Sequence, residues 1–414
     1  MTKRLFLIAG AALSVGTFAQ AQTLLDQGRA YRSELLSDAS TRTSSLAPAA
    51  QDFTPAVHGY EQFRFNWNSR DDQGLDSNNN DQTIGFQNAR TRLNVSGNIA
   101  NENWGYFIQF GFGDTERSSG GIGDGSSFSG SSGAFLEDAY GWYKMGNGWS
   151  LKWGQFKLPL FREELVGDQY QLFIDRSVTN STFSQMRSQG VQVSYEGDQF
   201  RFAGAFSDGL STANTDFTSG SEADYALTAR GEYKWAGDWK QAKDFTSFQN
   251  SEYFGMVGGA IHYQSGGDTV PTTDATDLAA TLDVSMEGNG WNAFAAVIYN
   301  NFDPNAGNSF SDWAFQIQGG IFVAADWEIV AGWDIMIPDS DYGSGSDSNF
   351  STLRVGVNHY VVPESHAAKI SIGLSYFIDN PSETAIVVPN TATGLLPSGK
   401  DSQWNLGGQV QLVF

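Results

Sequence analysis

The chain has 414 residues, of which only 17% are charged, and its formal net charge is −22. Nucleic acid is excluded as a natural partner, because binding to phosphate backbones needs clustered excess Lys and Arg. Cysteine is absent, which excludes disulfides, thiolate catalysis and cysteine-based metal sites. No internal stretch approaches the roughly 18 apolar residues that a membrane-spanning helix needs.

The N-terminal residues are typical of a secretory signal peptide. Two basic residues precede the apolar run LFLIAGAALSVGTFA (5–19), and the small residues AQA follow it. We therefore expect residues 1–21 to be removed and the mature protein to lie outside the cytoplasm. Residues 22–55 combine leucines at helical spacing with a linker-like stretch, so they predict a short periplasmic helix and linker, with a frayed tail as the alternative.

From residue 56 onward, apolar and polar residues alternate. In EADYALTARGEYKW (222–235), Tyr225 and Leu227 share one face of an extended chain, whereas Arg230 and Glu232 share the other. About sixteen such runs occur, near 56–68, 85–98, 103–113, 134–145, 149–159, 188–196, 199–207, 222–235, 252–264, 276–287, 290–301, 312–323, 327–336, 350–360, 367–378 and 402–414.

The connections between these runs alternate between long and short, although the one at 236–251 is longer than this pattern predicts. An even strand number and strands of about ten residues with apolar–polar alternation are typical of a transmembrane antiparallel β-barrel. Such a sheet must close on itself because lipid cannot satisfy an unpaired edge. We therefore predict an all-β outer-membrane barrel of about 16 strands over residues 56–414, surrounded by lipid, with both termini periplasmic. A soluble sandwich or propeller is the alternative.

The strand number also predicts what the barrel contains. Roughly eight strands give a filled interior, whereas about sixteen to eighteen leave an aqueous channel, so we expect a pore for small hydrophilic solutes. Strand parity directs a set of cations toward the lumen, where they would attract anions: Arg64, Arg90, Arg92, Arg201, Arg230, Arg354 and Lys369. Because Glu232 and Asp283 also face inward, a non-selective or weakly cation-preferring pore is the alternative.

The segment GQFKLPLFREEL (154–165) lies where a strand should continue. Pro159 cannot donate a ladder hydrogen bond, so regular pairing should end there. The chain then runs through 161–186 with too many apolar residues for an external loop. We predict that this third long connection folds into the barrel and constricts the pore.

Charge is concentrated at the start of this connection. Glu163, Glu164 and Asp168 are the acidic candidates at the constriction, and Lys157 and Arg162 are the basic ones. The spacing favours two opposed walls of an eyelet, with the cations facing Glu163 and Glu164 across the opening.

Five segments carry a resemblance to a known family. The segments that resemble the phosphate-selective porin O and P family are LKWGQFKLPLFREEL (151–165), FIDRSVTN (173–180), RSQGVQVSYEG (187–197), LEDAYGWYK (136–144) and NARTRLNVSG (88–97), and the likeness extends over essentially residues 56–414. It implies a trimeric 16-stranded porin that passes phosphate or pyrophosphate, as well as other small anionic or neutral solutes, past inward cations. The positions that fall within these segments become candidate anion-path residues: Arg90, Arg92, Lys157, Arg162, Arg176 and Arg187.

Other chemistries are less well supported. Adjacent carboxylates such as Glu163 and Glu164 point apart on a strand and do not make a catalytic pair. A barrel lipase would need a histidine beside a serine nucleophile, and the scattered His58, His359 and His366 indicate none. DSNNND (76–81) starts like a calcium loop but lacks the turn glycine, so weak surface Ca²⁺ is the alternative to a solvated loop and no other cofactor is predicted. A closed structural or adhesion barrel is the third class.

Overall fold

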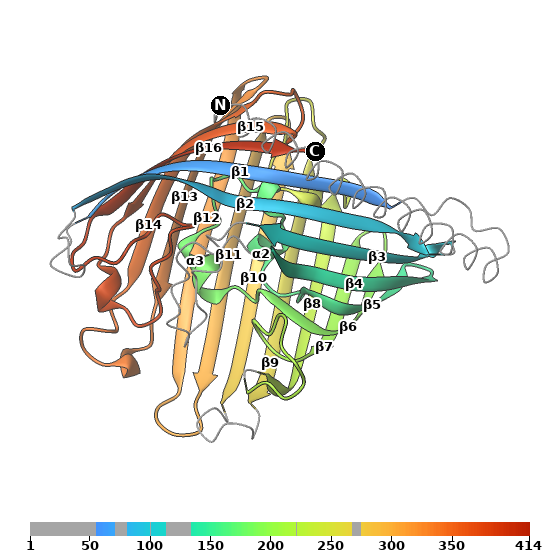
Figure 1. Ribbon diagram of the computed structural model, residues 1–414, viewed down its shortest axis with the longest axis horizontal. Helices are drawn as coiled ribbons and strands as arrows, with labels where there is room; N and C mark the ends of the chain where they lie inside the picture. Colours follow the sequence, from blue (N-terminus) through green and yellow to red (C-terminus); the bar gives the residue numbers. More distant parts are fainter. Residues whose placement is uncertain (1–54, 71–80, 100, 113–133, 221, 267–274) are drawn as a thin grey trace, which may run out of the picture. The chain divides into compact units, whose positions relative to one another are not determined.

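A computed structural model describes residues 55–70, 81–99, 101–112, 134–220, 222–266 and 275–414. The predicted signal peptide, residues 22–54 of the predicted helix and linker, and most of the calcium-like stretch lie outside the described residues. Sixteen antiparallel strands form one closed barrel, in which each strand pairs with its neighbours in sequence and β1 pairs with β16. Figure 1 shows β16, in red, beside β1, in blue. The predicted closed antiparallel barrel of about 16 strands is confirmed.

The strands agree closely with the predicted runs. They are β1 Ala56–Ser69, β2 Gln82–Ile99, β3 Asn101–Phe112, β4 Ala134–Gly146, β5 Trp149–Lys157, β6 Arg187–Glu196, β7 Phe200–Ser207, β8 Ala223–Ala236, β9 Phe254–Gly266, β10 Thr276–Gly288, β11 Trp291–Asp303, β12 Phe310–Ala324, β13 Trp327–Ile337, β14 Phe350–Tyr360, β15 Ala368–Phe377 and β16 Gln403–Val413. The short helices are α2 Arg162–Leu165 and α3 Val178–Phe183, with 3₁₀ turns η1 Asp168–Tyr170, η2 Gln241–Lys243, η3 Ser340–Tyr342 and η4 Pro381–Glu383. Among the described residues, no helix is long and apolar enough to cross a membrane.

The two faces of the wall differ in chemistry. On β12, Phe315, Ile317 and Ile321 are exposed on the outer surface, whereas Gln316 and Gln318 between them are buried. Successive side chains of a strand point to opposite faces, so apolar residues cover the outside and amides line the inside. This inverted arrangement suits a wall with lipid outside and water inside.

The chain terminus closes the barrel. The Gly59 N–H donates to the Phe414 carbonyl at 2.7 Å, and the Phe414 N–H donates back to the Gly59 carbonyl at 2.9 Å. Trp67 and Trp404 meet edge to face at the opposite end of the β1–β16 pair, with ring centroids 5.3 Å apart. The seam therefore satisfies the backbone groups that an open sheet would leave unpaired.

The connection between β5 and β6 begins where Pro159 predicts. The last pair of the β5–β6 ladder is Lys157 with Arg187, and residues 158–186, here called the inner loop, follow. The inner loop carries α2, η1 and α3, which Figure 1 draws in green.

The inner loop is bonded to inward-facing side chains around much of the wall. Its partners lie on β1, β8 and β12 to β16: Tyr60 with Asp168, Arg230 with Leu160, Ser177 with Gln316, Thr179 with Asp334, Asn358 with Leu172, Lys369 with Gln171 and Gln411 with Gln169. Since these strands present the same face to one segment, the inner loop lies inside the barrel.

Glycines on the wall let the inner loop approach closely. A Cβ added to Gly407 on β16 would lie 2.9 Å from Cδ1 of Ile174, and one added to Gly332 on β13 would lie 3.1 Å from the Phe173 ring. Both distances are shorter than an ordinary van der Waals contact. Glycine at these positions therefore makes a smooth surface on which the apolar centre of the inner loop docks.

Candidate functional site

A chain of ion pairs connects the inner loop to β1 and β2. Asp175 accepts hydrogen bonds from Arg64 at 3.0 Å and from Arg90 at 2.9 Å. Arg90 also lies 3.6 Å from Asp168. Two inward arginines predicted from strand parity therefore converge on carboxylates of the inner loop.

The same chain continues to the start of the inner loop. Arg176 pairs with Asp168 and lies 3.4 Å from Glu164, and Glu164 in turn lies 2.6 Å from the ammonium group of Lys157. These side chains are almost completely buried, apart from Lys157, which is 15% exposed. At such burial, each charge depends on its partners for solvation.

The carboxyl groups of the inner loop are held in their charged form. Burial alone would raise the pKa of Glu164, but Arg176 and Lys157 outweigh burial and lower this pKa to about 2. For the same reason, the neighbouring guanidinium groups hold the pKa of Asp168 well below its usual range and lower that of Asp175. All three groups are therefore ionised at neutral pH.

A second cluster lies on β2, β4 and β6. Arg92 lies 2.6 Å from Glu137, and Arg187 lies 3.1 Å from Glu137 and 3.3 Å from Asp138. The acidic residues belong to LEDAYGWYK on β4. They neutralise part of the positive charge that the sequence places on this side of the lumen.

A third cluster lies on β7, β8 and β10. Glu232 lies 2.6 Å from Arg201 and 2.9 Å from Arg230, and Arg230 also pairs with Asp283 at 2.9 Å. The ion pair between Arg354 of β14 and Asp334 of β13 is longer, since the guanidinium group and the carboxylate lie 3.7 Å apart.

Two candidate cations bond to backbone instead. The Arg162 guanidinium donates to the Ala242 carbonyl and lies 5.4 Å from the Phe245 ring centroid, and Lys369 donates to the Gln171 carbonyl at 2.8 Å. The other nine candidates are ion-paired: Arg64, Arg90, Arg92, Lys157, Arg176, Arg187, Arg201, Arg230 and Arg354.

The prediction of two opposed charged walls is wrong. Lys157 and Glu164 are in direct contact, and Glu163 accepts hydrogen bonds from the Ser177 N–H at 2.9 Å and its hydroxyl at 2.6 Å. The reason is that α2 turns Glu164 back toward the end of β5, a reversal that strand parity cannot anticipate. Glu163 instead holds Ser177, which is the N-cap residue of α3. The Ser177 side chain accepts a hydrogen bond from the Asn180 N–H in the first turn of that helix.

Two cavities border these groups. One lies between the inner loop and the β15–β16 connection, and its charged lining residues are Arg90, Glu164, Asp175, Arg176 and Arg187.

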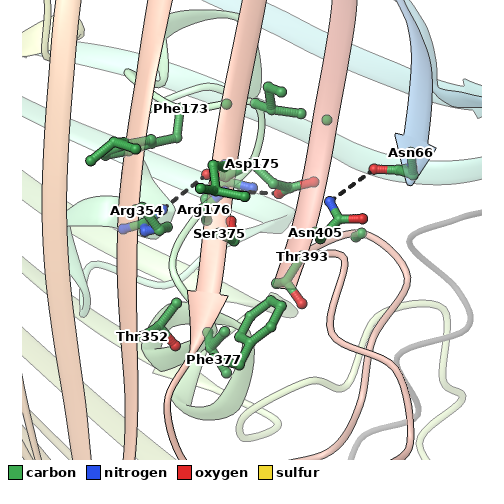
Figure 2. A pocket seen from close by; sticks show the side chains of 17 residues that line it. Asn66, Phe173, Asp175, Arg176, Thr352, Arg354, Ser375, Phe377, Thr393 and Asn405 are labelled. Atoms are coloured by element: carbon green, nitrogen blue, oxygen red, sulfur yellow. Dashed lines mark hydrogen bonds between the residues drawn. The ribbon is translucent and has the colours of Figure 1, made fainter. Parts of the chain in front are cut away.

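The other cavity, in Figure 2, lies between Phe173, Asp175 and Arg176 of the inner loop and strands β14 to β16. There the Asn405 amide donates to Asn66 at 3.2 Å, and Arg354 donates to the Asp175 carbonyl. Polar groups therefore line both cavities.

Sequence reasoning missed the acidic partners. Asp175, Glu137 and Asp138 were not among the candidates, yet each pairs with an inward arginine. Asp175 directly precedes Arg176 in FIDRSVTN, and that adjacency was the available sign of an acidic partner. No comparable sign marks Glu137, which only the β4 register brings close to Arg92 and Arg187.

The histidines take part in separate polar contacts. His262 bonds to Thr228 at 2.8 Å and His366 lies 3.5 Å from Asp244. Within the described ranges, no group of three or more His, Asp or Glu side chains is placed to hold a metal ion.

Known structures share the fold. OmpT of Vibrio cholerae is 14% identical with a TM-score of 0.56, and the match covers 88% of this chain and 99% of that one. An anion-selective porin from Comamonas acidovorans is 11% identical with a TM-score of 0.57 over 87% and 99% of the two chains. OprB of Pseudomonas putida is 10% identical with a TM-score of 0.56 over 87% and 94%.

Sequence comparison identifies the family. No curated protein sequence matches the chain significantly. The family profile described as phosphate-selective porin O and P matches residues 62–307, which is more than half of the chain and includes β2 to β11 with the whole inner loop. The chain therefore belongs to the phosphate-selective porin O and P family.

Proposed function

We propose that this outer-membrane porin is a passive diffusion channel for small hydrophilic solutes that prefers anions such as phosphate. Family membership and the sixteen-stranded barrel with a polar inner face support a channel rather than an enzyme. Binding at the wall depends on side-chain charge and hydrogen bonding, and the channel needs no cofactor.

One observation carries the anion preference. The cavity between the inner loop and the β15–β16 connection is bordered by three guanidinium groups and two carboxylates: Arg90, Arg176 and Arg187 against Glu164 and Asp175. Guanidinium groups match the oxygens of carboxylate and phosphate in a two-point contact. The lining has one cation more than it has carboxylates, and this excess favours anions only modestly because all three arginines are ion-paired.

The inner loop is proposed as the constriction. Its bonded partners lie on β1, β8 and β12 to β16, and in this proposal solutes pass between it and the remaining wall. The anion path then includes the inward cations of β2, β6 and β8, with Lys157 and Arg176 at the narrowest region, Glu164 and Asp168 as their acidic partners, and Glu163 beside them on Ser177.

We also propose that the mature protein begins after residue 21, has periplasmic termini and forms a homotrimer. A trimer form is described for OmpT of Vibrio cholerae, which shares the fold at 14% identity and a TM-score of 0.53. Chemical cross-linking of the detergent-solubilised protein tests this proposal, and a product limited to the monomer would contradict it.

The function is tested by electrophysiology. The purified protein is reconstituted into planar lipid bilayers, and single-channel conductance and the reversal potential in a KCl gradient are recorded with and without phosphate. We expect ohmic conductance, a reversal potential on the anion side and a reduced chloride current when phosphate is added. A protein that folds but never conducts would contradict the channel itself.

A weakly selective pore is the second candidate. It is favoured by the pairing of nine of the eleven candidate cations with carboxylates, which cancels much of their field at a distance. A reversal potential near zero or on the cation side, with no effect of phosphate, would favour this candidate.

A further inference from the structure

The connection between β8 and β9 is exceptional for its end of the barrel. The two neighbouring turns at that end contain only 197–199 and 289–290, whereas this one runs from 237 to 253. We call residues 237–253 the inner strap. A hairpin needs only two residues to reverse direction, so closing the β8–β9 pair does not account for its length.

The inner strap lies along the inner wall. The Phe245 ring lies tilted against the Phe294 ring of β11 at 4.8 Å, and Phe248 lies 5.4 Å from Phe322 of β12 and 5.1 Å from Tyr360 of β14, all between ring centroids. Phe294, Phe322 and Tyr360 are buried, and Phe322 shares the parity of the inward Gln316 and Gln318. The strap therefore folds from β8 and β9 into the lumen and reaches as far as β14.

Hydrogen bonds hold this path in place. The Ser247 hydroxyl donates to the Gly288 carbonyl at 2.8 Å, and the Gly290 N–H donates to the Phe248 carbonyl at 3.1 Å. The Thr246 hydroxyl lies 3.2 Å from the Tyr360 hydroxyl. The strap is thus bonded to the β10–β11 turn as well as to β14, which gives it a defined position.

The strap also contacts the inner loop. Arg162 at the start of α2 donates to the Ala242 carbonyl and lies over the Phe245 ring, and the Lys243 ammonium lies 4.6 Å from the centroid of the Tyr170 ring. Arg162 was predicted to line the ion path, but its guanidinium group is buried between these two segments. Lys243, in contrast, is exposed.

We propose that the inner strap is a second restriction of the pore, in series with the inner loop, and that Lys243 is its charge-selective residue. The inference rests on the proposed function, since only a conducting channel has a restriction to measure. Arg162 acts as a positioning residue that ties the strap to the inner loop. A solute that has passed the inner loop then meets the strap before it leaves through the short-turn end.

The first test shortens the strap. Replacing residues 237–253 by Asn-Gly leaves an ordinary two-residue hairpin between β8 and β9. Two similar restrictions in series contribute additive resistances, so removing one should raise single-channel conductance roughly twofold and admit larger neutral sugars. An unchanged conductance in a variant with the far-ultraviolet spectrum of a folded barrel would overturn the proposal.

The second test keeps the chain length and so does not depend on tolerance of the deletion. Phe248→Ala removes the aromatic contact to β12 and β14, and we expect higher conductance. The matched control is Phe217→Ala in the β7–β8 connection, where the ring is 93% exposed, and it should leave conductance unchanged. Equal effects of the two substitutions would count against the strap as a restriction.

The third test addresses charge. Lys243→Glu should shift the reversal potential toward cations, and by more than Lys400→Glu, which makes the same change at an exposed position of the β15–β16 connection. No shift with Lys243→Glu would remove Lys243 from the ion path. If the unaltered protein does not conduct at all, the proposed function fails, whereas a conducting protein with inert strap variants refutes the second restriction alone.

Discussion

At the scale of single residues, the acidic side chains of the inner loop pair with the cations that we propose as the anion path. Arg176 is central because it touches both Asp168 and Glu164, and Glu164 also holds Lys157. Burial disfavours the charged form of each of these side chains. They stay ionised because each one is in direct contact with a group of opposite charge.

Glu164→Gln should move the reversal potential toward anions at pH 7, because it removes one negative charge beside Lys157 and Arg176. The depressed pKa of about 2 means that Glu164 stabilises the fold above its unfolded value near 4.5, and that this contribution is lost as the pH falls through about 2. The difference in reversal potential between variant and original protein should therefore persist at about pH 4 and disappear near pH 2. A difference that disappears already near pH 4.5 would contradict the pairing.

Arg176→Ala should loosen the inner loop, because it leaves buried carboxylates without one of their partners. Breaking a buried pair in this way costs about 3–5 kcal/mol, so we expect faster proteolytic cleavage within residues 158–186. Arg176→Lys retains the charge but not the forked geometry of the guanidinium group. Its cleavage rate should therefore lie between those of the original protein and of Arg176→Ala. Equal cleavage rates of all three proteins would show that Arg176 does not hold the loop.

At the scale of elements, docking of the inner loop depends on the shape of the wall as much as on charge. Ile174 lies against Gly407 and Gly373, and Phe173 lies against Gly332, so apolar side chains fill the space that glycine leaves. This contact anchors the centre of a segment whose two ends are fixed by β5 and β6.

Gly407→Leu should displace the inner loop and raise single-channel conductance, because the new side chain must occupy the position of Ile174. Alanine is a weaker test, since the end of Ile174 can move by a few tenths of an ångström. Gly408→Leu is the matched control, because a Cβ there meets nothing within 4 Å. A similar conductance change in both variants would contradict the docking role of Gly407.

At the scale of the whole molecule, the barrel depends on joining strands that are far apart in sequence. Inner-face pairs such as Gln62 with Gln411, at 2.8 Å, add side-chain bonds to the backbone seam of β1 and β16. The last residue takes part directly, through the two backbone hydrogen bonds between Phe414 and Gly59.

Deleting Phe414 removes both of these bonds and should lower the free energy of unfolding by about 1–3 kcal/mol. Phe414→Leu keeps the two backbone hydrogen bonds, so it should lower the free energy of unfolding less than the deletion does. Urea unfolding in lipid vesicles, followed by tryptophan fluorescence, measures the difference. An unaltered unfolding midpoint after the deletion would show that the seam does not need its last residue.

The strands could be predicted from sequence because lipid imposes a period of two on every spanning segment. The predicted run at 350–360 coincides with β14, and Pro159 marks the loss of pairing after Lys157. The acidic partners could not be predicted, because parity gives a residue's face but not its neighbour across the lumen. The inner strap was visible only as an overlong turn, whose direction depends on aromatic contacts with strands remote in sequence.

The pairing of arginines with carboxylates has a consequence for transport speed. On the proposed anion path, each inner-loop carboxylate would compete with a passing anion for the guanidinium group to which it is bonded. A permeating phosphate must displace that competitor and, on leaving, is displaced by it, so the exchange is nearly balanced in free energy. Such a channel would bind a permeating anion weakly and release it rapidly. Its current should therefore saturate only at a high anion concentration.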